Sequence, residues 1–338
     1  MKIGDFDLDQ QVLIIAEIGN NHEGNFGVAQ KMVEEAAICG VDAVKFQTFK
    51  TEHYVNQLDS ARFERLKSFE LAFSEFEELS NLAHSHGLMF ISTPFDLASA
   101  NFLNNIVDSY KIASGDNTFY PLIKEVALTG KPMIVSTGIS YTGQIEKTVE
   151  FVKQTWRHNN VIGQLALLHC VSSYPVPNDQ ANLRSIQFLS EIFEGPVGYS
   201  DHTLGIDAVV LATALGAQIV EKHFTLDRNF SDFRDHQLSA DPMEMKNLVR
   251  RIRKTTSMLG VNQKRIEKCE NDLVAAVRRS IVAGKDMSMG HRISMSDLTW
   301  LRPAGGLAPG KEEALIGKVL KRRVSFGEQL SVADVEVI

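Results

Sequence analysis

Short apolar runs alternate with longer amphipathic stretches through the first three-quarters of the chain. Each run is four to eight residues long, rich in β-branched or aromatic residues, and apolar nearly throughout. Such runs are typical of strands that are buried on both faces, as in a parallel sheet. We predict strands at residues 12–19, 43–48, 88–93, 110–114, 133–138, 165–170, 197–200 and 219–225.

Helices are predicted between these strands. Amphipathic stretches occupy residues 27–40, 74–87 and 242–260, and each ends in a glycine that is suited to cap a helix. Eight strand–helix units in a row predict an α/β fold, the (β/α)8 TIM barrel. The competing fold, a doubly wound open sheet, usually carries GxGxxG after its first strand, and the loop GNNHEGNFG does not match that motif.

The alternation of strands and helices stops near residue 262, which predicts a second domain. We assign residues 1–262 to the barrel, 263–279 to a charged linker and 280–338 to a small β-rich domain whose segments are broken by glycine and proline. A domain of about 58 residues has a marginal hydrophobic core, so we expect it to dock on another surface.

Composition limits the partners and the location of the chain. Its 338 residues are 44% hydrophobic and 23% charged, and the net charge is −7. Such a chain does not attract nucleic acid or an anionic membrane as a whole. No apolar run approaches the ~18 residues of a membrane span. The acidic N-terminus lacks a signal-peptide pattern, and three dispersed cysteines argue against a disulfide framework. We therefore expect a cytoplasmic protein without nucleic-acid or membrane partners.

Two lysines lie inside predicted strands, where an unpaired charge is costly. Lys45 and Lys111 occupy the second and fourth strands, and serines and threonines stand at the strand ends. Because the carboxyl ends of barrel strands carry the active site, these lysines would concentrate positive charge in one pocket. Such a pocket suits a phosphate or a carboxylate. The alternative is that one lysine only pairs with Glu17 or Asp116.

Two histidines, His202 and His223, end neighbouring predicted strands. They lie 21 residues apart, one strand–helix unit, so they would stand close enough to share a divalent metal. Glu17, Asp201 and Glu221 would supply carboxylates nearby. A histidine in a protein core is more often structural, and this spacing alone is a weak indication of a metal.

Several motifs follow one another at the strand ends, and a further set fills the tail. They are IIAEIGNNHEGN, VKFQT, ISTPFD, YKIASGD, LLHCVSSYP, GYSDHT and EKHFTLD, then LTWLRPAGG and LIGKVLKRRVSFGEQL. Together they resemble the sialic acid synthases, which are phosphoenolpyruvate-dependent condensing enzymes. The tail resembles that family's C-terminal antifreeze-like (SAF) domain, a β-clip fold. The resemblance covers essentially the whole chain and implies a TIM barrel followed by an SAF domain.

The resemblance implies a reaction and a set of site residues. Phosphoenolpyruvate condenses with the aldehyde of an acylamino hexose, N-acetylmannosamine or a dideoxy relative, and a nonulosonic (sialic) acid and phosphate are released by C–O cleavage. A divalent metal, Mn or Mg, would be bound by His202 and His223. The catalytic set would be Glu17, Lys45, Lys111, His202, His223 and Asp235, with Glu17 in acid–base work. The substrate-binding set would be Gln47, Thr93, Ser114, Asp116, Ser172, Tyr174, Ser200, Glu221 and Arg302.

The resemblance also implies a domain-swapped homodimer, in which Arg302 of the SAF domain reaches the sugar site of the other subunit. Departures from the family pattern affect the site, among them Ala276, where some members have an aromatic residue. Asp116 stands where many members have glutamate, Ser172 where some have asparagine, and the loop 226–242 differs from the usual sugar-facing loop. The identity of the sugar therefore stays open among N-acetylmannosamine, a diacetamido relative and a 6-phosphate.

Three other functions remain as alternatives. The first is a synthase for another 2-keto-3-deoxy sugar acid on the same barrel, which the SAF tail disfavours. The second is a metal-dependent barrel hydrolase, which would need no two-lysine anion site. The third is a non-catalytic carbohydrate-binding scaffold, which would not require the lysines and histidines at the strand ends.

Overall fold

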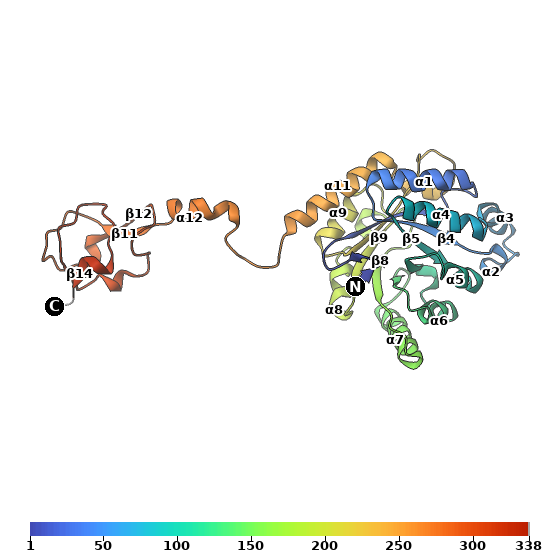
Figure 1. The fold of residues 1–338 in the computed structure, drawn as a ribbon, viewed down its shortest axis with the longest axis horizontal. Helices are drawn as coiled ribbons and strands as arrows, with labels where there is room; N and C mark the ends of the chain where they lie inside the picture. The colour runs from blue at the N-terminus through green and yellow to red at the C-terminus, as the bar shows by residue number, and fades with distance from the viewer. Residues whose placement is uncertain (337–338) are drawn as a thin grey trace. The chain divides into compact units, whose positions relative to one another are not determined.

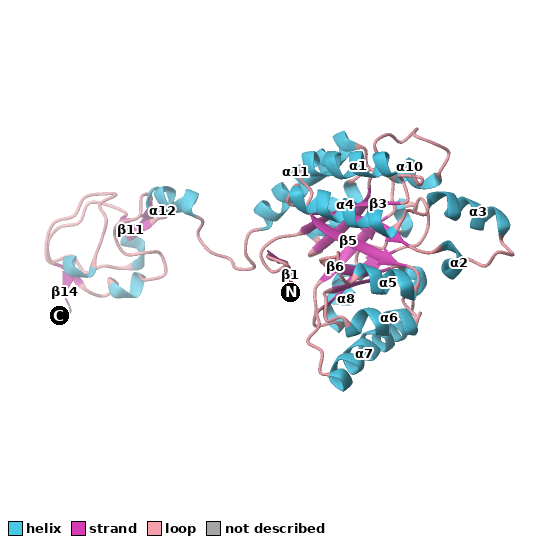
Figure 2. Cartoon of the chain, turned by 45° about the vertical axis from the view of Figure 1, so that its right-hand side comes forward, coloured by secondary structure: helices cyan, strands magenta, loops and turns pink. Residues whose placement is uncertain are grey.

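The computed structural model describes residues 1–336, so the last two residues of the predicted 280–338 domain lie outside the described part. The chain divides into two compact units, Met1–Gly260 and Val261–Ile338. The first unit contains the barrel, and Figures 1 and 2 show its strands surrounded by helices.

The first unit confirms the predicted (β/α)8 fold. Eight parallel strands close into a barrel in the order β10-β3-β4-β5-β6-β7-β8-β9 within the described residues. Each predicted strand is present, with ends that shift by no more than two residues. The strands are β3 Leu13–Gly19, β4 Ala43–Thr48, β5 Met89–Pro94, β6 Ser109–Ile112, β7 Met133–Ser136, β8 Leu165–Cys170, β9 Val197–Asp201 and β10 Ile219–His223.

One outer helix follows each barrel strand in the described part of the chain. These are α1 Phe26–Cys39, α4 Phe73–Ser85, α5 Leu97–Leu103, α6 Tyr120–Leu128, α7 Thr142–Asn159, α8 Ser185–Ile192, α9 Asp207–Ala214 and α11 Pro242–Leu259. Gly40 ends α1 in the left-handed conformation that the sequence predicts, and its N–H donates to Ala37. Short helices α2 Thr51–Tyr54, α3 Ser60–Phe69 and α10 Arg234–Leu238 lie in loops. Among the described helices, not one is both long enough and apolar enough for a membrane crossing.

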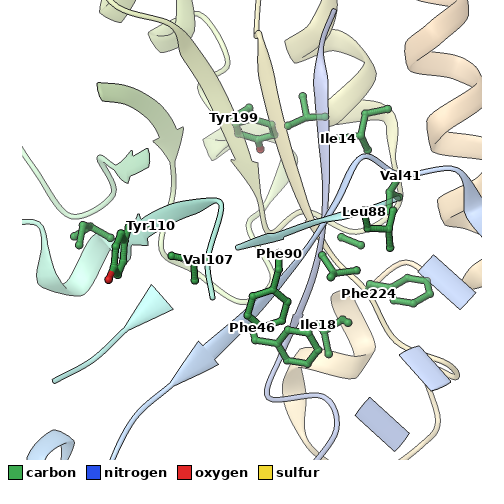
Figure 3. Close-up of a cluster of buried hydrophobic side chains, with 14 of the residues drawn as sticks. Ile14, Ile18, Val41, Phe46, Leu88, Phe90, Val107, Tyr110, Tyr199 and Phe224 are labelled. Carbon is green, nitrogen blue, oxygen red and sulfur yellow. The ribbon is translucent and has the colours of Figure 1, made fainter. Parts of the chain in front are cut away.

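Alternation along the strands separates the two sides of the barrel wall. In β4, Val44 and Phe46 pack in the layer between strands and helices, where Phe46 is fully buried (Figure 3). Ala43 belongs instead to the cluster inside the barrel, so Lys45 and Gln47 share its inward direction. Burial of a side chain such as Phe46 stabilises the fold by about 1.5–3 kcal/mol, which helps offset the cost of burying the charged Lys45.

An N-terminal hairpin closes one end of the barrel, and the sequence did not predict it. Strands β1 (Lys2–Ile3) and β2 (Phe6–Asp7) pair antiparallel, and Ile3 and Leu8 join the apolar cluster inside the barrel. This cluster includes the first residues of several strands, among them Leu13 and Ala43. The hairpin therefore covers the amino ends of the strands and leaves their carboxyl ends for chemistry.

The second unit is a small β-rich domain, in agreement with the SAF prediction. Strands β11 (Ser280–Ala283) and β12 (Leu298–Leu301) pair antiparallel, as do β13 (Val319–Leu320) and β14 (Val335–Glu336). Their apolar side chains form a separate core. Helix α12 (Asn271–Val277) lies within the stretch expected as a linker, and its Ala275 carbonyl accepts a hydrogen bond from the N–H of Ala304.

Candidate active site

The side chains that the sequence places at strand ends gather at the carboxyl end of the barrel. Side chains alternate between the two faces of each strand, and the neighbours of these residues pack against the helices. The side chains of these residues therefore point into the barrel. From β3 to β10 the inward polar residues are Glu17, Lys45, Gln47, Thr93, Lys111, Ser200, Glu221 and His223.

Four buried charges form the centre of this site. Lys45 Nζ lies 2.8 Å from Glu17 Oε2 and 3.6 Å from Glu221 Oε2, and Lys111 Nζ lies 3.4 Å from Glu221 Oε1. The four side chains are 2–5% exposed. We call this set the four-charge cluster. Two ammonium groups face two carboxylates, so the positive charge that the sequence predicts here is balanced. The alternative pairing of Lys45 with Glu17 is also present.

Burial and charge set different protonation preferences within the four-charge cluster. Burial raises the pKa of Glu17, against the opposing effect of Lys45. Burial alone would lower the pKa of Lys45, but the carboxylates of Glu17 and Glu221 raise it. Burial lowers the pKa of Lys111, and Glu221 only partly opposes this. Burial alone would raise the pKa of Glu221, but Lys111 and Lys45 lower it. Lys111 is therefore the less well compensated of the two ammonium groups.

Hydroxyl and amide groups line the four-charge cluster. Lys45 Nζ donates to Thr93 Oγ1 at 3.3 Å, and Ser200 Oγ donates to Glu221 Oε1 at 2.8 Å. Gln47 Nε2 donates to Glu17 Oε1 at 3.3 Å. Gln47 Oε1 in turn accepts a hydrogen bond from Asn20 Nδ2 at 2.8 Å. These contacts fix the orientation of both carboxylates.

A second group of hydroxyls surrounds Gly138 at the end of β7. The N–H of Gly138 donates to Ser114 Oγ at 3.1 Å. A Cβ atom at residue 138 would stand 2.5 Å from Ser172 Oγ and 2.6 Å from Ser114 Oγ, so only glycine leaves these hydroxyls room. A cavity of ≈ 620 Å³ adjoins Ser172. The sequence prediction named both serines but missed Gly138, whose signal was the glycine that ends the run MIVSTG.

Two imidazoles stand side by side next to the four-charge cluster. The ring centroids of His202 and His223 are 5.3 Å apart, and the Tyr174 ring packs 4.2 Å from that of His202. His202 Nδ1 donates to the carbonyl of Val171 at 3.0 Å. His223 Nδ1 is buried and has no hydrogen-bond partner within residues 1–336. Burial, together with His202, holds the pKa of His223 well below its usual value, so this imidazole is neutral at pH 7.

The two histidines fit a catalytic divalent metal better than a structural one. A neutral imidazole with an unsatisfied buried nitrogen is the form that binds metals. Within residues 1–336, no three His, Cys, Asp or Glu side chains gather as a complete set of ligands. A metal bound by His202 and His223 alone would need further ligands, such as water or substrate, to complete its coordination.

Helix α10 brings Asp235 and Arg234 to the mouth of the barrel, at the carboxyl end of its strands. Asp235 is buried, and its Oδ1 accepts no hydrogen bond although Arg234 Nε lies 3.4 Å away. Burial raises the pKa of Asp235, and Arg234 opposes this shift. The guanidinium of Arg234 lies 4.8 Å from the centre of the Tyr174 ring. The sequence reasoning missed Arg234, which stands directly before the aspartate it named.

Two predicted residues, Asp116 and Arg302, are not members of the four-charge cluster. Asp116 ends a short 3-10 turn, Ser114–Asp116, and forms no ion pair with a lysine among the described residues; burial raises its pKa to about 6. Arg302 belongs to the second unit, where it is exposed directly after β12. Tyr174 and Ser172 are partly buried in the segment that follows β8.

Comparison with known proteins places both units. The NeuB family profile matches residues 32–264, and the SAF domain profile matches residues 278–336. An N,N'-diacetyllegionaminic acid synthase from Legionella pneumophila is 40% identical, over 96% of this chain and 94% of that protein. The human N-acetylneuraminate-9-phosphate synthase is 32% identical, over 85% of this chain and 82% of that protein.

A solved structure is similar as well. The N-acetylneuraminic acid synthetase from Leptospira borgpetersenii, crystallised with citrate, matches with a TM-score of 0.76 and 35% identity. The match covers 81% of this chain and 94% of that protein.

Proposed function

The chain belongs to the NeuB family, and we propose that it condenses phosphoenolpyruvate with an acylamino hexose to give a nonulosonic acid and phosphate. The observation that carries the proposal is the four-charge cluster beside the two imidazoles. The alternative, a metal-dependent hydrolase, would need only water and a metal. Two buried lysines between carboxylates instead suit a substrate that carries several negative charges.

Phosphoenolpyruvate would occupy the space between the lysines and the serines. Lys45 and Lys111 would face its carboxylate and phosphate, with Ser114, Ser172 and Gly138 forming a hydroxyl-lined recess. Because Glu17 and Glu221 already balance the lysines, an anionic substrate must draw on further positive charge. Arg234 at the mouth is one source of it.

Carbon–carbon bond formation would require the two substrates in fixed contact. Carbon 3 of phosphoenolpyruvate attacks the sugar aldehyde, whose oxygen takes up a proton. Water then adds to carbon 2 and loses a proton, and the C–O bond to phosphate breaks. Glu17 is our candidate for moving a proton, because its carboxyl lies in the barrel lumen within reach of Lys45 and Gln47.

A divalent metal, Mn or Mg, held by His202 and His223, would supply Lewis-acid polarisation of the aldehyde when bound. The chain's own contribution is to keep His223 neutral through burial and to orient His202. The hydrogen bond from His202 Nδ1 to Val171 leaves the other ring nitrogen of His202 free for a ligand.

We propose a diacetamido hexose as the sugar, ahead of N-acetylmannosamine or a 6-phosphate. The relative from Legionella, which is named for a diacetylated product, is 40% identical, against 32% for the human 9-phosphate synthase. Asp235 Oδ1, which accepts no hydrogen bond within residues 1–336, supports a neutral donor such as a hydroxyl or an amide N–H, because a sugar phosphate would face a like charge.

We extend the proposal to a homodimer in which Arg302 of one chain serves the sugar site of the other. The support is the family resemblance and the need of a small domain for a docking surface. Asp116 is assigned a part in substrate binding on the resemblance alone.

The test is phosphate release with phosphoenolpyruvate and Mn²⁺ across a panel of hexosamines, followed by the mass of each product. We expect phosphate release only with an acylamino hexose, and the diacetamido sugar to give the highest kcat/KM. H223A should abolish metal-dependent turnover, and the exposed-site variant H158A is its matched control. Release without any sugar, or with none of the panel, would overturn the proposal.

A further inference from the structure

A second buried ion pair lies on the opposite side of the barrel wall from the four-charge cluster. Lys222 Nζ lies 2.7 Å from Asp201 Oδ2, and the two side chains are 1% and 0% exposed. Their neighbours along the strands, Ser200 and Glu221, face the lumen and bond to each other. The pair therefore faces the helices, on the same face of β9 as Tyr199 (Figure 3).

The Lys222–Asp201 pair also holds the backbone directly after His202. Lys222 Nζ donates to the carbonyl of Thr203 at 2.6 Å. Asp201 Oδ1 accepts from the N–H of Thr203 at 2.9 Å and from the hydroxyl of Tyr199 at 3.0 Å. His202 thus sits between two residues that are both bonded to the same lysine.

The register of the sheet connects this pair to the second histidine. Asp201 and Lys222 are direct partners across β9 and β10; His202 directly follows β9, and His223 is the last residue of β10. The backbone carbonyls of both histidines are also hydrogen-bonded. The carbonyl of His202 accepts the N–H of Val176 at 2.9 Å. The carbonyl of His223 accepts an N–H at 2.8 Å in the same way.

A buried ion pair is a costly way to join two strands. Removing both charges from water costs several kcal/mol per ion, and well-packed apolar side chains stabilise a fold at least as well. What apolar side chains cannot supply is the directional set of hydrogen bonds that fixes Thr203 relative to Lys222. Groups behind the ligands of a metal site commonly change its affinity by 10–100-fold.

We propose that Lys222 and Asp201 are positioning residues that set the separation of the His202 and His223 imidazoles for a divalent cation. The inference rests on the proposed metal-binding role of these histidines. The proposal gives the pair a function beyond stabilising the fold. Lys222, the residue before His223, is hydrogen-bonded to the residues on both sides of His202.

The experiment measures Mn²⁺ binding to the full chain by calorimetry and by the Mn²⁺ resonance spectrum, with thermal unfolding in parallel. K222M should lower both Mn²⁺ affinity, by about tenfold or more, and stability, because Asp201 is left as an unpaired buried charge. The double variant K222M/D201N removes both charges and keeps an acceptor for Tyr199 and Thr203. We expect it to recover most of the stability while Mn²⁺ affinity stays weak.

The matched control is D42N, at the other end of the barrel. Asp42 pairs with Arg253 and accepts the N–H of Ile14, so its loss destabilises the barrel far from the histidines. Mn²⁺ affinity that returns together with stability in K222M/D201N, or falls equally in D42N, would overturn the positioning role alone. Wild-type protein that binds no Mn²⁺ would overturn it together with the metal assignment, whereas sugar-dependent phosphate release would still test the condensation itself.

Discussion

Lys45 and Lys111 are the same residue type in the same barrel, but their surroundings differ. Lys45 lies against two carboxylates, and Lys111 against one. Residue type and strand position predicted both lysines as inward charges. The bridging of both by Glu221 was not predictable, because it depends on side chains that meet across the lumen from β4, β6 and β10.

K111M should weaken phosphoenolpyruvate binding, and this should be the largest effect of the substitution. Removing one partner of a buried charged contact costs about 2–5 kcal/mol, which corresponds to roughly 30-fold or more in affinity. Calorimetric titration with phosphoenolpyruvate measures this directly. K124M, a lysine exposed on α6, is the control and should bind as the wild type does. Equal affinity in K111M would remove the anion-site assignment.

Asp116 predicts a pH dependence of stability. Burial raises its pKa to about 6, so between the unfolded value near 3.8 and pH 6 the folded state holds a proton that the unfolded state has lost. The folded state then loses stability as pH rises through this window. After allowance for solvent screening of a partly exposed group, we expect a loss of roughly 1–2 kcal/mol.

D116N should remove this dependence. The difference in free energy of unfolding between wild type and D116N, measured with urea from pH 4 to pH 7, should shift in favour of D116N as pH rises. A difference that does not change with pH would mean that Asp116 ionises at an ordinary pKa.

Other site residues escaped prediction because their role depends on shape. Gly138 matters only because two serine hydroxyls from different loops occupy the space where its Cβ would be. Arg234 matters because α10 places it over Tyr174. Neither residue has a periodic signal, whereas Lys45 and His223 were visible as polar positions in apolar strands.

At the scale of elements, the eight strands were predictable because each is a buried run with a clear apolar pattern. The N-terminal hairpin was missed because its strands are two residues long, too short for any periodicity. Helices α2 and α3 were missed because they lie in a loop and bury few apolar residues.

The loop 226–241 is held at the mouth by one buried histidine. His236 is fully buried; its Nε2 lies 3.0 Å from Glu23 Oε1 and its Nδ1 lies 2.7 Å from Thr225 Oγ1. Ser231, from the same loop, also donates to Glu23. Glu23 follows β3, so it connects the first and the last loops of the barrel and fixes the helix that carries Asp235.

E23A should therefore raise the KM for the sugar, by roughly 30-fold, with little change in phosphoenolpyruvate affinity. The reason is that two hydrogen bonds to the loop are lost while the four-charge cluster stays intact, at about 1 kcal/mol for each bond. Steady-state kinetics with each substrate varied in turn measure the split. E23Q keeps an acceptor and should retain most of the sugar affinity. Equal losses for both substrates would show a general effect on the fold.

At the scale of the whole molecule, charge divides unevenly between the two units. Residues 1–260 carry 22 basic and 32 acidic side chains, a net charge of −10, and residues 261–338 carry 13 basic and 10 acidic, a net charge of +3. Opposite net charges favour association of a tail with a barrel, and they do so equally within a chain or between chains.

Mixing two inactive variants distinguishes these arrangements. K111M damages only the barrel site and R302A only the tail. In a swapped dimer of one K111M chain and one R302A chain, the intact barrel of the R302A chain receives Arg302 from the K111M chain, so one of the two sites is complete. Random pairing makes half of the dimers mixed, which predicts recovery of about one quarter of wild-type activity after the variants are mixed and allowed to exchange. If Arg302 serves its own barrel, both sites of every dimer stay defective and mixing restores nothing. The same measurement on K111M and R302A kept apart gives the baseline against which recovery is judged.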